Sequence, residues 1–215
     1  WHPRGVVIVA NVLYITANPK ASEKSVSLSL GQEFLREYKE ARPKDEITVL
    51  DLYKSDIPEI DYELMDAMGS LMAGLSPASL PEQARKKLER YNQFTDQFVN
   101  ADKYVFVTPM WNLGMPPRVK TYLDTVCVAG KTFKYTEKGP EGLLQNKKCL
   151  HIHASGGFHS QDNHADAYLR DLMRFLGVED YRSLVVEGHN ALPDKAKSII
   201  NEVRAKIPVT VGWFA

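Results

Sequence analysis

Short apolar segments alternate with amphipathic helical patterns along this chain, and the alternation constrains the fold more than any other feature of the sequence. Such alternation is typical of βαβ units built around a parallel sheet with helices on both faces. For an α/β chain of this length, a five-stranded sheet in the order 2-1-3-4-5 is the commonest simple solution. The predicted strands are residues 12–16, 47–52, 104–108, 149–154 and 183–187.

The length of 215 residues fits one large α/β domain. We expect residues 10–215 to form it, because residues 10–16 already read as a complete first strand. Residues 1–9 precede that strand, and we interpret them as a cloning remnant. The apolar run that they form with the first strand is too short and too interrupted for a transmembrane helix.

Charge and cysteine content exclude several classes of function. Lys+Arg and Asp+Glu both total 27, so nothing favours nucleic acid, an anionic membrane or a strongly charged partner. Cys127 and Cys149 are too few for a disulfide framework, and their spacing matches no metal or redox pair. A cytoplasmic protein is the expected reading, and neither thiol is assigned a role in catalysis.

Ligands of such a fold bind beyond the carboxyl ends of the first, third and fourth strands. Three loops should therefore converge there, namely residues 16–27, 109–117 and 155–159. Two segments, residues 56–81 and 131–144, are additional to a minimal five-stranded domain. Additions beside a ligand crevice often form lids or dimer contacts.

The first of these loops lacks both the glycine fingerprint of dinucleotide-binding folds and the lysine of a P-loop. Backbone N–H groups at the start of the following helix, together with the hydroxyls of Ser25 and Ser27, could still bind a phosphate without a mandatory cation. The alternative is that one of these serines simply caps the helix. Both can hold together, because a capped helix end still points N–H groups outward.

The second loop carries an aromatic ring, a side-chain amide and a glycine ahead of a helix that starts with proline. Trp111 could close the core or stack on a ligand. Its place between a strand end and Pro116 favours the ligand reading, and Asn112 can both donate to and accept from the edge of a heterocycle.

In the third loop, Gly156 and Gly157 permit a close backbone approach, and His159 could stabilise negative charge on a ligand. A lone loop histidine is more often an ordinary surface group. His151 and His153 share one face of the fourth strand, and with His159 and His164 they could suggest zinc. We expect no metal site, because no acidic or cysteine ligand has suitable spacing; core histidines with satisfied hydrogen bonds are the better interpretation.

Several ordered motifs together resemble one family. They are Pro109-Met-Trp-Asn-Leu-Gly-Met-Pro-Pro, Lys120-Thr-Tyr-Leu-Asp, Gly130-Lys-Thr-Phe-Lys-Tyr-Thr, Gly139-Pro-Glu-Gly and Ser155-Gly-Gly-Phe-His. The sequence is similar to the FMN-dependent NADH:quinone oxidoreductases, also called azoreductases, from about Asn11 to the last helix. The resemblance implies a flavodoxin-like homodimer with one tightly bound FMN per active site, each site being built at the subunit interface.

The resemblance also implies roles for individual positions. The phosphate would be held by Asn18, Ser25, Val26 and Ser27. The isoalloxazine would be bordered by Pro109, Met110, Trp111, Asn112 and Leu113. Its pyrimidine end would meet Ser155, Gly156, Gly157 and His159, and Tyr135 would lie near the substrate cavity. Two positions depart from the common pattern, since relatives often carry Tyr in place of Trp111 and Arg in place of Ser155.

The activity that the resemblance implies is hydride transfer from NADH, or NADPH, to FMN, followed by two-electron reduction of a quinone or aromatic azo compound in a ping-pong mechanism. His159 and Tyr135 are the residues expected to take part. The alternatives are a flavodoxin-type electron-transfer module, an NAD(P)H-dependent FMN reductase, and a redox-sensing interaction protein with the same fold. The formal net charge of zero is not typical of an electron carrier that is steered to its partner by electrostatic attraction.

Overall fold

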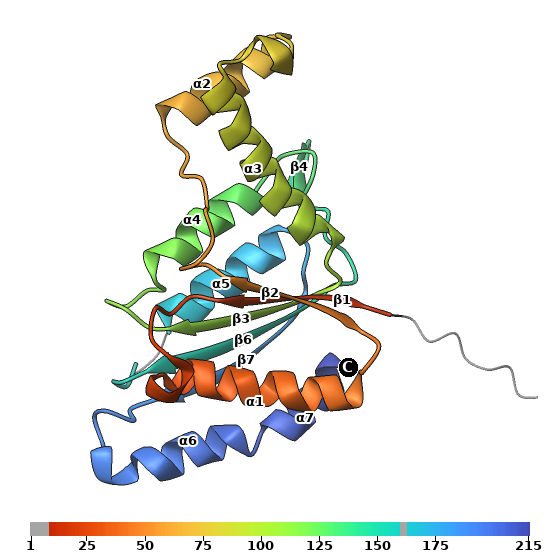
Figure 1. The fold of residues 1–215 in the computed structure, drawn as a ribbon. Coiled ribbons are helices and arrows are strands. Elements are labelled where there is room, and N and C mark those ends of the chain that lie inside the picture. Colours follow the sequence, from red (N-terminus) through yellow and green to blue (C-terminus); the bar gives the residue numbers. More distant parts are fainter. Residues whose placement is uncertain (1–8, 160–162) are drawn as a thin grey trace, which may run out of the picture.

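A five-stranded parallel sheet forms the centre of the molecule (Figure 1), in a computed structural model that describes residues 9–159 and 163–215. The strands are β1 (Asn11–Thr16), β2 (Glu46–Asp51), β3 (Lys103–Pro109), β6 (Lys148–Ser155) and β7 (Asp180–Glu187). They are ordered β2-β1-β3-β6-β7, and every pairing is parallel. Counted in chain order, this is the predicted 2-1-3-4-5 arrangement. Of the expected cloning remnant, residues 1–8 lie outside the described part of the chain.

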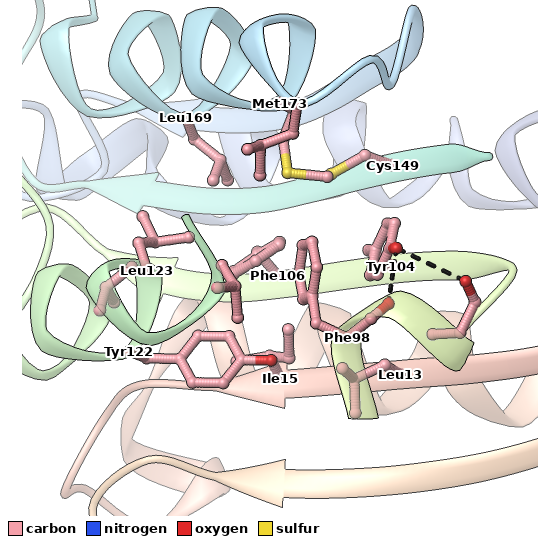
Figure 2. Packing of buried hydrophobic residues seen from close by; sticks show 14 of the residues in the cluster. Leu13, Ile15, Phe98, Tyr104, Phe106, Tyr122, Leu123, Cys149, Leu169 and Met173 are labelled. Carbon is pink, nitrogen blue, oxygen red and sulfur yellow. Dashed lines mark hydrogen bonds between the residues drawn. The ribbon is translucent and has the colours of Figure 1, made fainter. Parts of the chain in front are cut away.

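Helices cover both faces of the sheet, as the sequence predicts. Three of them pack on one face, namely α1 (Val26–Ala41), α6 (Ala196–Arg204) and α7 (Ile207–Phe214). The other face carries α3 (Glu82–Asn100), α4 (Pro117–Val126) and α5 (His164–Phe175). Figure 2 shows side chains of this second layer, with Phe98, Tyr122, Leu123, Leu169 and Met173 packed toward Leu13, Ile15, Tyr104 and Phe106 of the sheet.

Local sequence explains where the helices begin. Ser25 caps α1 with its side chain, and Pro117 occupies the first turn of α4, where a missing N–H costs little. Along α1, the buried residues Leu30, Phe34 and Tyr38 recur at helical spacing and face the sheet. Short 3₁₀ turns occupy Ser22–Lys24 (η1), Pro77–Ser79 (η2) and Pro193–Lys195 (η3).

One helix extends away from the sheet. In Figure 1, α2 (Tyr62–Met72) and the first half of α3 stand apart from the layered body. Leu64 and Ala67 of α2 are buried against the α3 residues Ala84 and Leu88 in a small separate core. The extra segment 56–81 supplies α2 of this pair, whereas α3 begins just after it, at Glu82.

The second extra segment is a hairpin that the sequence analysis did not resolve into strands. β4 (Phe133–Thr136) pairs antiparallel with β5 (Gly139–Gly142). It packs near the end of α5, where Phe133 lies 4.7 Å from Phe175 between ring centroids and Leu144 N–H donates to Leu176 O. Because α5 runs back from the carboxyl edge of the sheet, this places the hairpin at the amino edge (Figure 1). The hairpin is therefore not a lid over the crevice of its own chain, and dimer contacts remain the predicted role of this segment.

β7 begins at Asp180, whereas the sequence analysis placed its start at Ser183. Its first four residues are exposed or half-buried, as an edge strand permits. The apolar run that marks a buried strand in the sequence is therefore shorter than the strand itself.

Polar side chains are linked beneath the carboxyl edge. Thr108 Oγ1 lies 2.8 Å from His151 Nε2 and 3.0 Å from His153 Nδ1, and His151 Nδ1 lies 2.8 Å from Asp166 Oδ1. The prediction of core histidines with satisfied hydrogen bonds is confirmed for His151 and is wrong for one nitrogen of His153. His153 Nε2 has no partner in the described part of the chain, and burial lowers the pKa of His153 to about 3, so this ring is neutral at pH 7.

We predict opposite effects for alanine at two helical glycines. A Cβ on Gly31 would lie 2.4 Å from Tyr14 Oη and 2.9 Å from Val107 Cγ1, so Gly31→Ala should lower the free energy of unfolding by about 1–3 kcal/mol. A Cβ on Gly69 of α2 would have no other atom within 4 Å. Gly69→Ala should therefore raise the free energy of unfolding by about 0.5–1 kcal/mol. Urea titrations of both variants test this; a neutral Gly31→Ala would mean that α1 does not pack this closely on the sheet.

Candidate functional site

The three predicted loops meet in one cavity of about 390 Å³ at the carboxyl edge of the sheet. That volume lies within the range of small-molecule sites. The predicted site residues that line it are Asn18, Ser25, Val26, Ser27, Pro109, Met110, Trp111 and Gly156. Residues from β1, β3 and β6 therefore converge as the fold requires.

The wall formed by the first loop is held by side-chain hydrogen bonds. Asn18 Nδ2 donates to Ser25 Oγ over 2.9 Å, and the hydroxyls of Ser25 and Ser27 lie 3.3 Å apart. Ser25 Oγ also accepts from Leu28 N–H at 3.3 Å, which is the capping bond of α1. The capping interpretation is confirmed, and the same serine lines the cavity, so the two interpretations are compatible.

The second loop makes a tight turn. Trp111 and Gly114 exchange backbone hydrogen bonds of 2.8 and 2.9 Å, and the central residues Asn112 and Leu113 have φ values of 50° and 66°. Two positive φ values are the pattern of a type I′ turn. Trp111 lines the cavity and lies 6.2 Å from Tyr53 between ring centroids. Asn112 and Leu113 are exposed and lie outside the lining.

The third loop contributes Gly156 directly and holds His159 beside it. Ser155 is buried, and its Oγ lies 2.7 Å from His159 Nε2. The His159 N–H also donates to Glu187 Oε2 at 3.4 Å, which ties the loop to the end of β7. Ser155, Gly157 and His159 flank the cavity without lining it.

Five residues line the cavity that the sequence analysis did not name, namely Lys20, Lys24, Ala154, His189 and Asn190. His189 and Asn190 come from the loop after β7, whose carboxyl end lies at the same edge. The sequence could have indicated these two residues, because every loop that follows a strand of a parallel sheet lies at this edge. Asn190 N–H donates to Gly156 O at 3.0 Å, and a Cβ on Gly156 would lie 2.5 Å from Asn190 Nδ2. Gly156 is thus the residue that allows the two loops to touch.

Tyr135 is not brought to this cavity. It lies on β4, at the amino edge of the sheet, and 75% of it is exposed. Its ring makes an edge contact with Phe133, with 5.4 Å between ring centroids. A role for Tyr135 near a substrate therefore requires the cavity of another chain.

The lining fits a flat ligand that carries an anion at one end. The first loop contributes the polar side chains of Asn18, Ser25 and Ser27 to the lining, and the second loop contributes Met110 and Trp111 as apolar surface. His189 also lines the cavity, and burial lowers its pKa, which favours the neutral imidazole; its Nδ1 is buried without a partner in the described part of the chain. A flavin mononucleotide has a phosphate, a hydroxylated chain and a flat ring that suit these features.

Comparison with known proteins agrees with this geometry. A family model described as a flavodoxin-like fold matches residues 10–209. An FMN-dependent NADH:quinone oxidoreductase of Trichlorobacter lovleyi is 52% identical over 96% of this chain and 100% of its own length. An FMN-dependent NADH:quinone oxidoreductase 2 of Bacillus subtilis is 47% identical over 92% of this chain and 96% of its own.

Solved structures give the same result. An azoreductase from Bacillus anthracis str. Sterne superposes with a TM-score of 0.88 at 36% identity, covering 96% of this chain and 100% of that one. An FMN-dependent NADH-azoreductase from Bacillus anthracis str. Ames Ancestor, solved in complex with FMN, has a TM-score of 0.85 at 31% identity, covering 94% and 100%. This chain belongs to the flavodoxin-like family of FMN-dependent NADH:quinone oxidoreductases and azoreductases.

Proposed function

We propose that this protein is an FMN-dependent NADH:quinone oxidoreductase that also reduces aromatic azo compounds. The observation that carries the proposal is that Ser25 and Ser27 of the first loop and Met110 and Trp111 of the second line one cavity. Relatives at about half identity are named for this activity, and a solved relative contains FMN. FMN, when bound, supplies reversible two-electron hydride chemistry.

The residues of the first loop would hold the phosphate. Ser25, Ser27 and the N–H groups at the start of α1 provide donors, and Asn18 orients Ser25 through its hydrogen bond. Pro109, Met110 and Trp111 would border the ring, with Asn112 and Leu113 at its exposed edge. No side-chain nucleophile is needed, and burial raises the pKa of the Cys127 thiol to about 11 and that of Cys149 well above its usual value.

His159 and the glycine loop would stabilise charge. Hydride uptake makes the pyrimidine end of a flavin more negative, and preorganised donors at that end favour two-electron chemistry. Ser155 engages Nε2 of His159, and no residue in the described ranges bonds Nδ1 of this ring. His159 is thereby held in one orientation beside Gly156 and Gly157, with a nitrogen to present to the ligand.

One site would serve both half-reactions. NADH would bind against the ring first and the quinone or azo acceptor would take the same place after it, with bound FMN supplying the hydride chemistry. The exposed apolar groups Leu113 and Phe158, each 59% exposed, are available to contact a flat aromatic molecule. We propose NADH, with NADPH as the alternative donor, and a cytoplasmic location in keeping with two free thiols.

We further propose a homodimer whose active sites lie at the interface. Large apolar side chains are exposed on α2 and the turn after it, with Tyr62 at 96%, Met72 at 91% and Leu75 at 54%. Surfaces of this kind mark protein contacts. Tyr135 cannot reach the cavity of its own chain, and a second copy would let it serve the partner's cavity. No helix in the described part of the chain has the length and apolar character to cross a membrane.

The purified protein reconstituted with FMN should be yellow, should be bleached by NADH without oxygen and should regain its colour when a quinone is added. Absorbance spectra under anaerobic conditions measure each step. Protein that cannot take up FMN would refute the proposal. Large accumulation of a one-electron flavin state during titration would favour an electron-transfer module, and flavin bleaching without acceptor turnover would favour an FMN reductase.

Replacing His159 should slow the reaction more than it weakens FMN. Removing one preorganised donor typically costs roughly 10²-fold in rate, so we expect His159→Ala to reduce kcat to that degree while FMN affinity changes little. Ser155→Ala should produce a smaller loss, because His159 remains but is no longer held. His164→Ala, an exposed residue at the start of α5, serves as the control. Unchanged kcat in His159→Ala would remove its proposed role.

Light scattering should give twice the mass of one chain. A lysine on the apolar α2 surface should oppose association, because a buried unpaired charge is costly, so Met72→Lys is expected to raise the monomer fraction and lower activity together. Asp66→Asn on the same helix is the matched control, since Asp66 is already polar and exposed. A fully active monomer would contradict an active site at the interface.

A further inference from the structure

Two lysines stand on the cavity wall that the sequence analysis described as built from neutral donors. Lys20 lies in the loop after β1, and Lys24 ends the η1 turn immediately before the cap residue Ser25. Both line the same cavity as Ser25 and Ser27. Of the described residues in that lining, these two alone carry a full charge, and none is a carboxylate.

Neither amino group is neutralised within the described part of the chain. Some other lysines are neutralised by carboxylates, as Lys86 is by Glu82 and Lys131 by Asp96. Lys20 and Lys24 have no such ion pair in the described ranges. The nearest acidic residue in sequence, Glu23, is exposed, accepts a hydrogen bond from Ser22 Oγ at 2.8 Å, and does not line the cavity.

The backbone that carries the lysines is fixed at both ends. Lys20 N–H donates to Asn18 Oδ1 over 3.0 Å, and Asn18 Nδ2 donates to Ser25 Oγ. Lys24 N–H and Ser25 N–H close the η1 turn onto Ala21 O and Ser22 O. The loop is therefore preorganised with its two cations beside the positive end of α1, and the two sources of positive charge add.

We propose that Lys20 and Lys24 recognise the dianionic phosphate of the flavin and make this cavity selective for FMN over riboflavin. The inference rests on the proposed function and specifies how its cofactor is chosen. The same phosphate chemistry occurs in the pyrophosphate of NADH. We assign the lysines to the phosphomonoester, because they belong to the same loop as the serine hydroxyls and line the same cavity, and because Lys24 immediately precedes the cap residue Ser25.

The test uses full-length apoprotein and measures flavin binding by fluorescence quenching, not turnover. Lys20→Gln and Lys24→Gln should each weaken FMN about threefold to fivefold, and the double variant about tenfold or more, as expected for partly exposed ion pairs to a doubly charged group. Riboflavin affinity should not change. Lys39→Gln is the matched control, because Lys39 is an exposed lysine at the other end of α1.

The salt dependence of FMN binding is a second test of the contact between the lysines and the phosphate. Raising NaCl from about 10 mM to about 1 M shortens the screening length roughly tenfold, so it should weaken FMN binding to the wild type and affect the double variant far less. Riboflavin binding should be insensitive in both. An equal loss of FMN and riboflavin in the double variant would show that the lysines support the loop rather than the phosphate, and would overturn the inference.

Two other results would overturn it as well. FMN affinity that is unchanged in the double variant while the KM for NADH rises would assign the lysines to the pyrophosphate of the nucleotide. Wild-type protein that binds riboflavin as tightly as FMN would refute phosphate selection and leave the proposed flavin chemistry intact. Protein that binds neither flavin would instead refute the proposed function itself.

Discussion

Parallel pairing of all five strands is the constraint on which the rest of this structure depends. It sends every strand in one direction, so the carboxyl ends of β1, β3, β6 and β7 share one edge of the sheet. Each strand must then be followed by a helix that returns over a face, which buries both faces and leaves the loops at the edge to bind ligands. The strand topology therefore determines where the cavity lies, whichever residues line it.

The same constraint decides what could be predicted from the sequence. Periodicity and apolar runs locate the buried strands, and strand order then brings Ser25, Trp111 and Gly156 together. Lys20 and Lys24 were missed because a surface lysine in a polar loop has no pattern that distinguishes it from solvated charge. Asn190 was missed because its contact with Gly156 joins two loops that are distant in sequence, and only the folded chain shows it.

The β4–β5 hairpin illustrates a different limit. β4 reads Phe-Lys-Tyr-Thr and alternates apolar with polar side chains, but it is only four residues long. β5 reads Gly-Pro-Glu-Gly, residue types that are depleted in strands. Besides the packing of Phe133 on Phe175, the hairpin depends on the close approach of Gly142 to Gly177, where a Cβ on Gly142 would clash with the Gly177 backbone. A backbone contact of this type leaves no signature in either segment alone.

The turn at Asn112 and Leu113 has a consequence for the range of molecules that the cavity accepts. Left-handed backbone at two non-glycine residues costs on the order of 1 kcal/mol each, and it persists because the reciprocal bonds of Trp111 and Gly114 restrict the turn to one shape. Of the residues in this turn, Trp111 lines the cavity, so the turn fixes the position of that ring and does not act as a closing lid. A fixed aromatic surface suits flat molecules, so we expect both planar dyes and planar quinones to fit against it.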